Sequence, residues 1–126
     1  MRHVTRIALI IVAVIHLLPV AGVLGAAQLA TAYGIDITGP DLEILMRHRA
    51  LLFGIVAGLC LLAVFRPLYT TLALLVALAS VVSFLVLAQI VGGYGEAIGR
   101  IVLADCIALA ALLVAVFSHA RTRRQR

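Results

Sequence analysis

The sequence predicts an all-α membrane protein, specifically a four-transmembrane-helix antiparallel bundle. Hydrophobic residues make up 65% of the 126 residues and charged residues only 12%, whereas soluble domains hold about 45–50% and about 25%. The mean hydropathy is +1.25. A single soluble domain of this length keeps much of its surface in water and has no room to bury so many apolar side chains. A lipid bilayer, which is itself apolar, removes that difficulty.

Four apolar runs are each long enough for the roughly 20 helical residues that cross a bilayer. The expected helices cover residues 7–29, 41–65, 68–91 and 97–117, and residues 118–126 form a basic tail. Glycine and proline punctuate the connections at residues 33–40, at Arg66-Pro67 and at residues 92–95. The runs are apolar on every side rather than along one stripe, which distinguishes spanning helices from surface helices.

The arginines predict how the chain is oriented in the membrane. Short connections make neighbouring helices antiparallel. Seven of the ten arginines then lie on one side and three on the other: Arg2, Arg6, Arg66 and the four of the tail against Arg47, Arg49 and Arg100. By the positive-inside rule both termini face the cytoplasm. The net charge of +5 therefore indicates topology and contact with lipid headgroups, and no nucleic-acid partner is expected. The alternative, a signal peptide cleaved near residues 30–32, would leave three spans.

Asp105 is the only acidic residue inside a predicted span, roughly 12 Å below the outer boundary. A lone carboxylate at that depth must pair, hydrogen-bond or take up a proton. It is either a proton or ligand site or the structural partner of an arginine. Arg49 is the expected ion-pair partner, so the losses of stability in Asp105→Ala and Arg49→Ala should be less than additive. A small polar pocket in the outer half is predicted from Arg47, Arg49, Gln89, Arg100 and Asp105.

His16 lies near the middle of the first predicted span, one turn before Pro19. An intramembrane histidine can relay protons or bind a metal or haem, or it can simply bond a backbone carbonyl freed by the proline. Bis-histidine haem ligation is not expected, because His48 lies roughly 9 Å away in depth. Ser80, Ser83 and Gln89 are expected to hydrogen-bond between helices, and Gly54 and Gly58 form a GxxxG packing motif.

Several short motifs resemble one family of small membrane proteins. Tyr33-Gly34-Ile35-Asp36 follows the first helix, Arg49 leads into Gly54 and Gly58, and Phe65-Arg66-Pro67 ends the second helix. In these motifs and in its layout the chain resembles the small four-helix bacterial membrane proteins grouped as DoxX-like and a related family of unknown function. It differs from their pattern in its doubled Arg47-His48-Arg49. The resemblance implies a bacterial inner (plasma) membrane protein and, at most, a quinone-linked accessory redox role.

No catalytic or metal site is expected, because the sequence lacks a phosphate loop, a dinucleotide motif, a catalytic triad and zinc-ligand spacing. The favoured interpretation is a non-enzymatic small bundle or accessory subunit that partners another membrane protein or forms a homo-oligomer. One alternative is a redox accessory protein that binds quinone or lipid. Another is a small proton-coupled transporter similar to four-helix multidrug exporters. That resemblance implies a membrane-embedded glutamate in the first helix, whereas this chain carries His16 and no acidic residue there.

Overall fold

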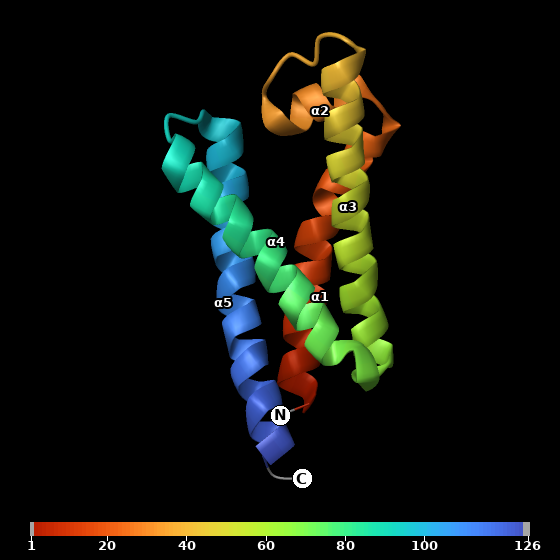
Figure 1. Cartoon of the computed structure of the whole chain (residues 1–126), viewed down its shortest axis with the longest axis vertical. Helices are drawn as coiled ribbons and strands as arrows, with labels where there is room; N and C mark the ends of the chain where they lie inside the picture. The colour runs from red at the N-terminus through yellow and green to blue at the C-terminus, as the bar shows by residue number, and fades with distance from the viewer. Residues whose placement is uncertain (1, 125–126) are drawn as a thin grey trace.

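The computed structural model describes residues 2–124, which fold into helices with no strand among them. Four helical segments are long and apolar enough to cross a membrane: His3–Leu24, Pro40–Phe65, Pro67–Val91 and Glu96–Thr122. They run alternately up and down, so the two ends of the chain lie together (Figure 1). We call that end the terminal end and the opposite end the α2 end. The predicted all-α class with four spanning helices is confirmed.

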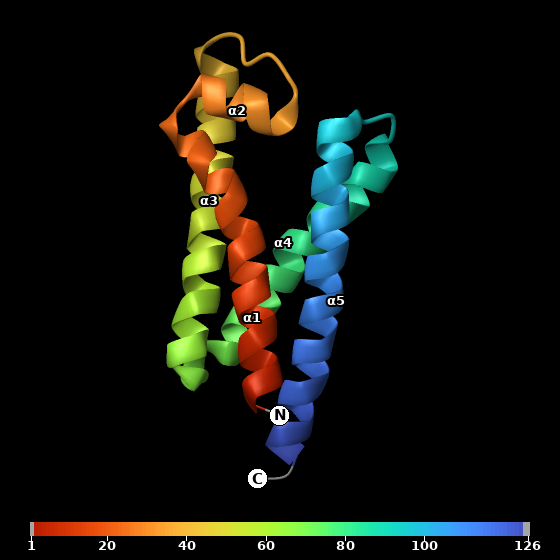
Figure 2. The ribbon, with the colours of Figure 1, turned by 180° about the vertical axis from the view of Figure 1, so that it is seen from behind.

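The first span is not the single helix predicted for residues 7–29. Helix α1 (Arg2–Leu17) passes into the 3₁₀ helix η1 (Leu18–Leu24), and the separate short helix α2 (Ala26–Tyr33) lies across the end of the molecule (Figure 2). Pro19 has no N–H and therefore interrupts the α-helical hydrogen bonds. Gly25, at φ +146°, then turns the chain, a conformation that residues with a Cβ rarely adopt.

Close contact between η1 and α2 depends on Gly22. A Cβ at this position would lie 2.5 Å from Cδ2 of Leu29, and the Leu29 side chain is fully buried. Tyr33 is also buried, and α2 ends at Gly34, whose N–H donates to the carbonyl of Ala30 at 2.8 Å. The absence of a side chain at position 22 therefore lets the buried Leu29 pack directly against η1.

The remaining spans begin and end close to where the sequence predicts. Helix α3 covers Pro40–Phe65, η2 covers Pro67–Tyr69, α4 covers Thr70–Val91 and α5 covers Glu96–Arg124. The fourth helix is longer than the predicted 97–117 and continues through most of the expected basic tail. Residues 125–126 of that tail lie outside the described residues.

Small side chains dominate the core between the helices. Helix α1 packs against α3 and α5, and α4 packs against the same two helices. The α4 face that turns inward carries the buried residues Ala73, Ala77 and Val81, which are spaced one turn apart. Inside a bilayer no hydrophobic force drives helices together, so association depends on close packing of small residues. Large apolar side chains such as Leu68 and Ile90 point outward, at 86% and 74% exposure.

The GxxxG motif does not form a helix contact within the chain. A Cβ at Gly54 would lie 3.5 Å from Cγ2 of Val20, an ordinary contact with η1. At Gly58 no atom lies within 4 Å of the place that a Cβ would take. The predicted packing role of the pair is therefore limited to Gly54 in a single copy of the chain, because Gly58 faces outward.

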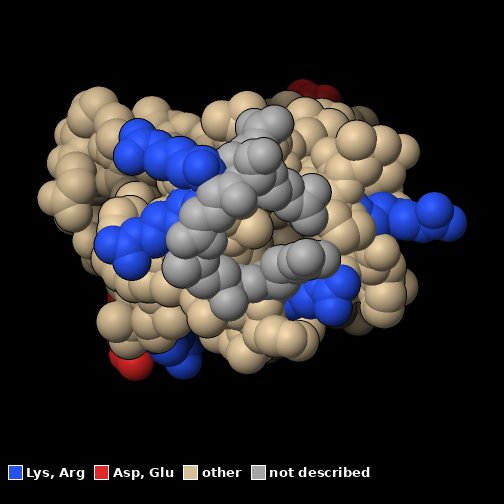
Figure 3. Space-filling view, turned by 90° about the horizontal axis from the view of Figure 1, so that it is seen from below, with Lys and Arg blue, Asp and Glu red and all other residues tan. Residues whose placement is uncertain are grey.

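Charge is distributed unevenly between the two ends. Among the described residues, four arginines are exposed at the terminal end: Arg6, Arg66, Arg121 and Arg124. Seen from that side, basic side chains project at several places on the surface (Figure 3). The acidic residues of the chain lie instead in the 33–40 connection, at the starts of α3 and α5, and at Asp105.

The Gly22→Ala variant should destabilise the protein by about 1–3 kcal/mol, because the added methyl group overlaps the buried Leu29 side chain. The measurement is the free energy of unfolding in mixed micelles titrated with denaturing detergent. Gly58→Ala is the matched control, since its methyl group meets open space. Gly22→Ala combined with Leu29→Ala should lose less than the sum of the two single variants, because the overlap is absent once Leu29 is truncated. Equal stability of the two single variants would contradict this account of the turn.

Candidate functional site

A cavity of about 360 Å³ lies at the α2 end, where the helices diverge. Both ribbon views show α4 and α5 leaning away from α2 and α3 at this end (Figures 1 and 2). The lining comes from α1, η1, α2, α3 and α5 and is mainly apolar. Its polar members are His16, Thr31, Tyr33, Arg100 and Asp105. A largely apolar cavity with a few convergent polar groups is the usual form of a small-molecule site.

Arg49 lies beside this cavity among three aromatic rings. Its guanidinium carbon is 5.4 Å from the ring centroid of Tyr33 and 5.2 Å from those of Phe53 and Phe84. Each ring comes from a different helix: α2, α3 and α4. A cation over aromatic faces is attracted to them, most strongly where water is excluded. Arg49 therefore joins three elements and contacts two of the rings that line the cavity, those of Tyr33 and Phe53.

Asp105 lies close to Arg49 but does not form the predicted direct ion pair. The side chain is 8% exposed and is within electrostatic range of the Arg49 guanidinium. Among residues 2–124, the one ion pair within 4.0 Å joins Arg47 and Glu43 instead. The sequence prediction was wrong on this contact: the guanidinium is surrounded by three aromatic rings and makes no ion pair with the carboxylate.

Tyr33, on α2, lies within electrostatic range of both Arg49 and Asp105. Burial raises the pKa of its hydroxyl, while the Arg49 guanidinium lowers the same pKa and the Asp105 carboxylate raises it. Both charges therefore act on the phenol. Tyr33, Asp105 and Arg100 line the cavity, and Arg49 lies behind Tyr33 and Phe53 rather than in the lining.

Arg47 and Gln89 do not belong to the site, contrary to the prediction. Arg47 donates from Nε to the carbonyl oxygen of Val23 at 3.0 Å and from Nη1 to Glu43 at 3.1 Å. It thereby caps the end of η1. The side chains of Arg47 and Arg49 point about 200° apart around the helix, so only one of them faces the cavity. Gln89 is exposed on α4 and does not line the cavity.

His16 connects two spans through a hydrogen bond. Its Nδ1 lies 2.9 Å from the carbonyl oxygen of Val12, and its Nε2 lies 3.3 Å from Oγ of Ser80 on α4. Since a carbonyl only accepts, a neutral His16 carries its proton on Nδ1 and accepts from the Ser80 hydroxyl. The prediction paired His16 with the backbone carbonyl that Pro19 leaves without a donor. That carbonyl lies one turn after Val12, so the observed bond is to a different residue than the predicted one. The expected interhelical role of Ser80 is confirmed.

The aromatic residues were the part of the site that sequence reasoning missed. Tyr33 drew notice only as part of a loop motif, and Phe84 gave no signal among so many apolar neighbours. Phe53, four residues after Arg49, was expected on the same helical stripe but not as a ring in contact with it. Nothing in spacing alone places three rings from three helices around one arginine. Among residues 2–124 there is also no group of three or more His, Cys, Asp or Glu side chains arranged to hold a metal ion.

The fold and site define a multi-pass, all-α membrane protein with a partly polar cavity at one end. Comparison with known proteins adds no relative: no family model, no curated protein and no solved structure matches the chain. The resemblance to DoxX-like proteins therefore stays a prediction from the sequence.

Arg49→Gln and Asp105→Asn should each lower the free energy of unfolding, and the double variant should lose about 1 kcal/mol less than the sum. The cause is the electrostatic interaction of the two charges across the cavity. The measurement is the same denaturing-detergent titration. Arg47→Gln combined with Asp105→Asn is the control pair and should be additive, because Arg47 pairs with Glu43 and Asp105 interacts with Arg49. Additivity in both pairs would remove the proposed interaction.

Proposed function

We propose that the protein is a non-enzymatic accessory membrane protein that holds a quinone-like or lipid-like molecule in the cavity at the α2 end. The observation that supports this is the composition of the cavity, in which apolar walls meet the Tyr33 hydroxyl, Arg100 and Asp105. Its volume of about 360 Å³ falls within the range of about 300–1,000 Å³ typical of ligand sites.

The position of the cavity favours a ligand that dissolves in the membrane. Its apolar lining includes Ile15, Leu18 and Phe53, and His16, Phe53 and Asp105 belong to segments long enough to span a bilayer. A polar metabolite would lose its hydration against these walls without enough partners in exchange. A molecule with an apolar chain and a small polar head pays no such cost.

The charges around the cavity favour a neutral polar head over a strongly charged one. The positive Arg49 and the negative Asp105 offset each other in the interior, which leaves the exposed Arg100 as the one unbalanced charge that the described residues bring to the cavity. A quinone ring offers two carbonyl acceptors, and Tyr33 and Arg100 are donors on the cavity wall. Phe53 supplies an aromatic surface beside them. A quinone head is therefore the ligand class we favour, in agreement with the family resemblance.

A second candidate function, association with another membrane protein or a second copy, is favoured by Gly58. This glycine lies in the middle of α3 on the outward face, with no atom within 4 Å of the place a Cβ would take. A neighbouring helix would meet no side chain there and could approach the backbone closely. This role is compatible with ligand binding, since the cavity and Gly58 do not overlap.

We further infer that the protein lies in a bacterial inner membrane with both termini in the cytoplasm. The exposed arginines of the terminal end support this orientation through the positive-inside rule.

In a bacterial host, a fluorescent-protein fusion to the C-terminus should fluoresce, and an alkaline phosphatase fusion at the same place should be inactive. The same reporters joined after Gly93, in the α4–α5 connection, should give the opposite result. Each position serves as the control for the other. Active phosphatase at the C-terminus would contradict the proposed orientation.

Native mass spectrometry of the full chain, supplemented with a short-chain ubiquinone, should show one bound molecule. Ala104→Phe should reduce its occupancy at least about tenfold, because the new ring fills the cavity that Ala104 lines. Ala110→Phe is the matched control on the same helix, since Ala110 is exposed and outside the cavity. Absence of binding to the unaltered chain, or equal occupancy in both variants, would contradict the proposal.

A further inference from the structure

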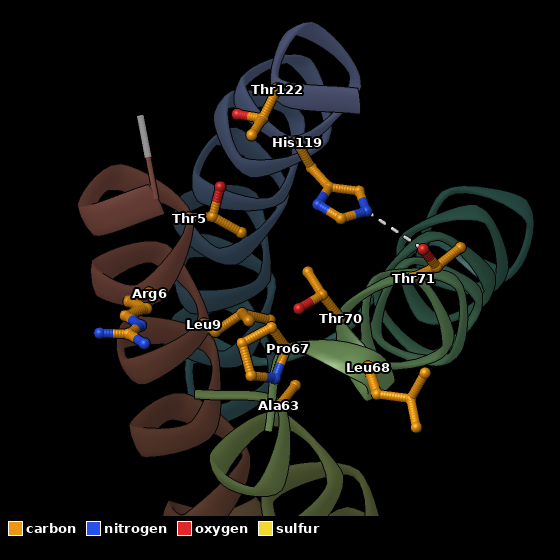
Figure 4. A pocket seen from close by; sticks show the side chains of 10 residues that line it. All are labelled: Thr5, Arg6, Leu9, Ala63, Pro67, Leu68, Thr70, Thr71, His119 and Thr122. Atoms are coloured by element: carbon orange, nitrogen blue, oxygen red, sulfur yellow. Dashed lines mark hydrogen bonds between the residues drawn. The ribbon is translucent and has the colours of Figure 1, made fainter. Parts of the chain in front are cut away.

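A second cavity, of about 440 Å³, opens at the terminal end and is unrelated to the quinone-like site. It lies between the first turns of α1, the η2–α4 start, the last turns of α5 and Ala63 of α3 (Figure 4). Unlike the cavity at the α2 end, it is rich in hydroxyl groups. Four threonines line it: Thr5, Thr70, Thr71 and Thr122.

Two of these threonines are largely buried, with hydroxyls that remain accessible from the cavity. Thr5 is 7% exposed and Thr70 is 6% exposed, and neither hydroxyl is hydrogen-bonded to any of residues 2–124. In Figure 4 both side chains lie beside the central space of the cavity. Buried polar groups are normally satisfied, and no buried side-chain nitrogen or oxygen among the described residues lacks a hydrogen-bond partner. The two hydroxyls are therefore open to whatever occupies the cavity. A ligand with acceptor oxygens would satisfy both.

His119 and Thr71 form the opposite wall. The Thr71 hydroxyl and Nε2 of His119 are 3.1 Å apart, and Figure 4 shows the imidazole lying between Thr71 and Thr122. The Thr122 hydroxyl donates to the carbonyl of Ser118 at 2.9 Å. These bonds fix the side chains of this wall in place, so that the cavity has a defined polar side before any ligand enters.

The electrostatic surroundings favour an anion. No acidic residue lines the cavity, and Arg6 lies at its rim with its guanidinium directed away from the centre in Figure 4. Arg6 is exposed and long enough to turn toward a ligand. Thr5 and Thr70 lie in the first turns of α1 and α4, whose positive dipole ends point to this end of the molecule. Further arginines are exposed at the same end of the molecule (Figure 3).

We propose that this cavity binds the phosphate group of a phosphate ester. The hydroxyls of Thr5 and Thr70 donate to phosphate oxygens, and Arg6 supplies the opposite charge. Leu9 and Leu68 give the cavity an apolar side, which suits a glycerol or acyl portion next to the phosphate. The shared chemistry has two sources, the headgroup of an anionic phospholipid and a free phosphorylated compound, and the experiment separates them.

The experiment measures ligand occupancy by native mass spectrometry of the full chain in neutral detergent. The probes are phosphatidylglycerol, diacylglycerol with the same chains, and glycerol 3-phosphate. Phosphatidylglycerol should bind and diacylglycerol should bind at least about tenfold more weakly, because it lacks the phosphate. Binding of glycerol 3-phosphate as strong as that of the lipid would assign the site to soluble esters. Weaker binding would assign it to the lipid headgroup.

The variants test the residues. Thr5→Val combined with Thr70→Val keeps the shape and should weaken phosphate-ester binding about tenfold, whereas the exposed Thr38→Val should change nothing. Arg6→Gln should weaken binding roughly fivefold. Arg121→Gln, at the same end but outside the cavity, is its control. If the threonine double variant fails to fold, the two arginine variants decide. Equal binding in Arg6→Gln and Arg121→Gln, or equal binding of lipid with and without phosphate, overturns the proposal.

Discussion

Close packing of small side chains is the constraint on which the rest of the structure depends. A bilayer satisfies the apolar exterior, so no hydrophobic force remains to draw the helices together. Contact must come from surfaces that approach closely, and the buried alanines of α1, α4 and α5 provide them. Polar links such as His16 to Ser80 then fix how the helices are rotated against each other. The buried alanines mark where neighbouring helices are in contact.

The break between Pro19 and Gly25 divides one long apolar run into a membrane span, α1 with η1, and the short helix α2 that lies across the end of the molecule. Hydropathy alone continues to Leu29, because η1 and α2 are nearly as apolar as α1. The chain instead folds back against Gly22, and Tyr33 comes to lie against Arg49. A continuous helix would have carried Tyr33 away from the molecule. The cavity at the α2 end therefore exists because a proline and two glycines interrupt a sequence that otherwise favours a longer helix.

The spans were predictable from the sequence and the site was only partly so, for different physical reasons. Bilayer thickness fixes how many apolar residues a span needs, so α3 and α4 end close to the predicted residues. Which arginine faces inward depends on how α3 is rotated against its neighbours, and tertiary packing decides that. Arg49 and Asp105 were correctly placed near each other, whereas Arg47 was placed in the pocket but caps η1. The aromatic rings that hold Arg49 come from segments far apart in the chain.

The two cavities lie at opposite ends of the molecule, and small buried side chains fill the space between them. Alanine and valine at residues 12, 13, 73, 77, 81 and 108 leave little space between neighbouring backbones. At the α2 end the helices diverge (Figures 1 and 2). Polar side chains are tolerated toward both ends, because lipid headgroups and water are near. The ends differ in charge: opposite charges offset each other beside the cavity at the α2 end, whereas arginines predominate at the terminal end. Two cavities with different polar linings therefore lie at opposite ends of one set of packed helices, and the exposed arginines are distributed unevenly between those ends.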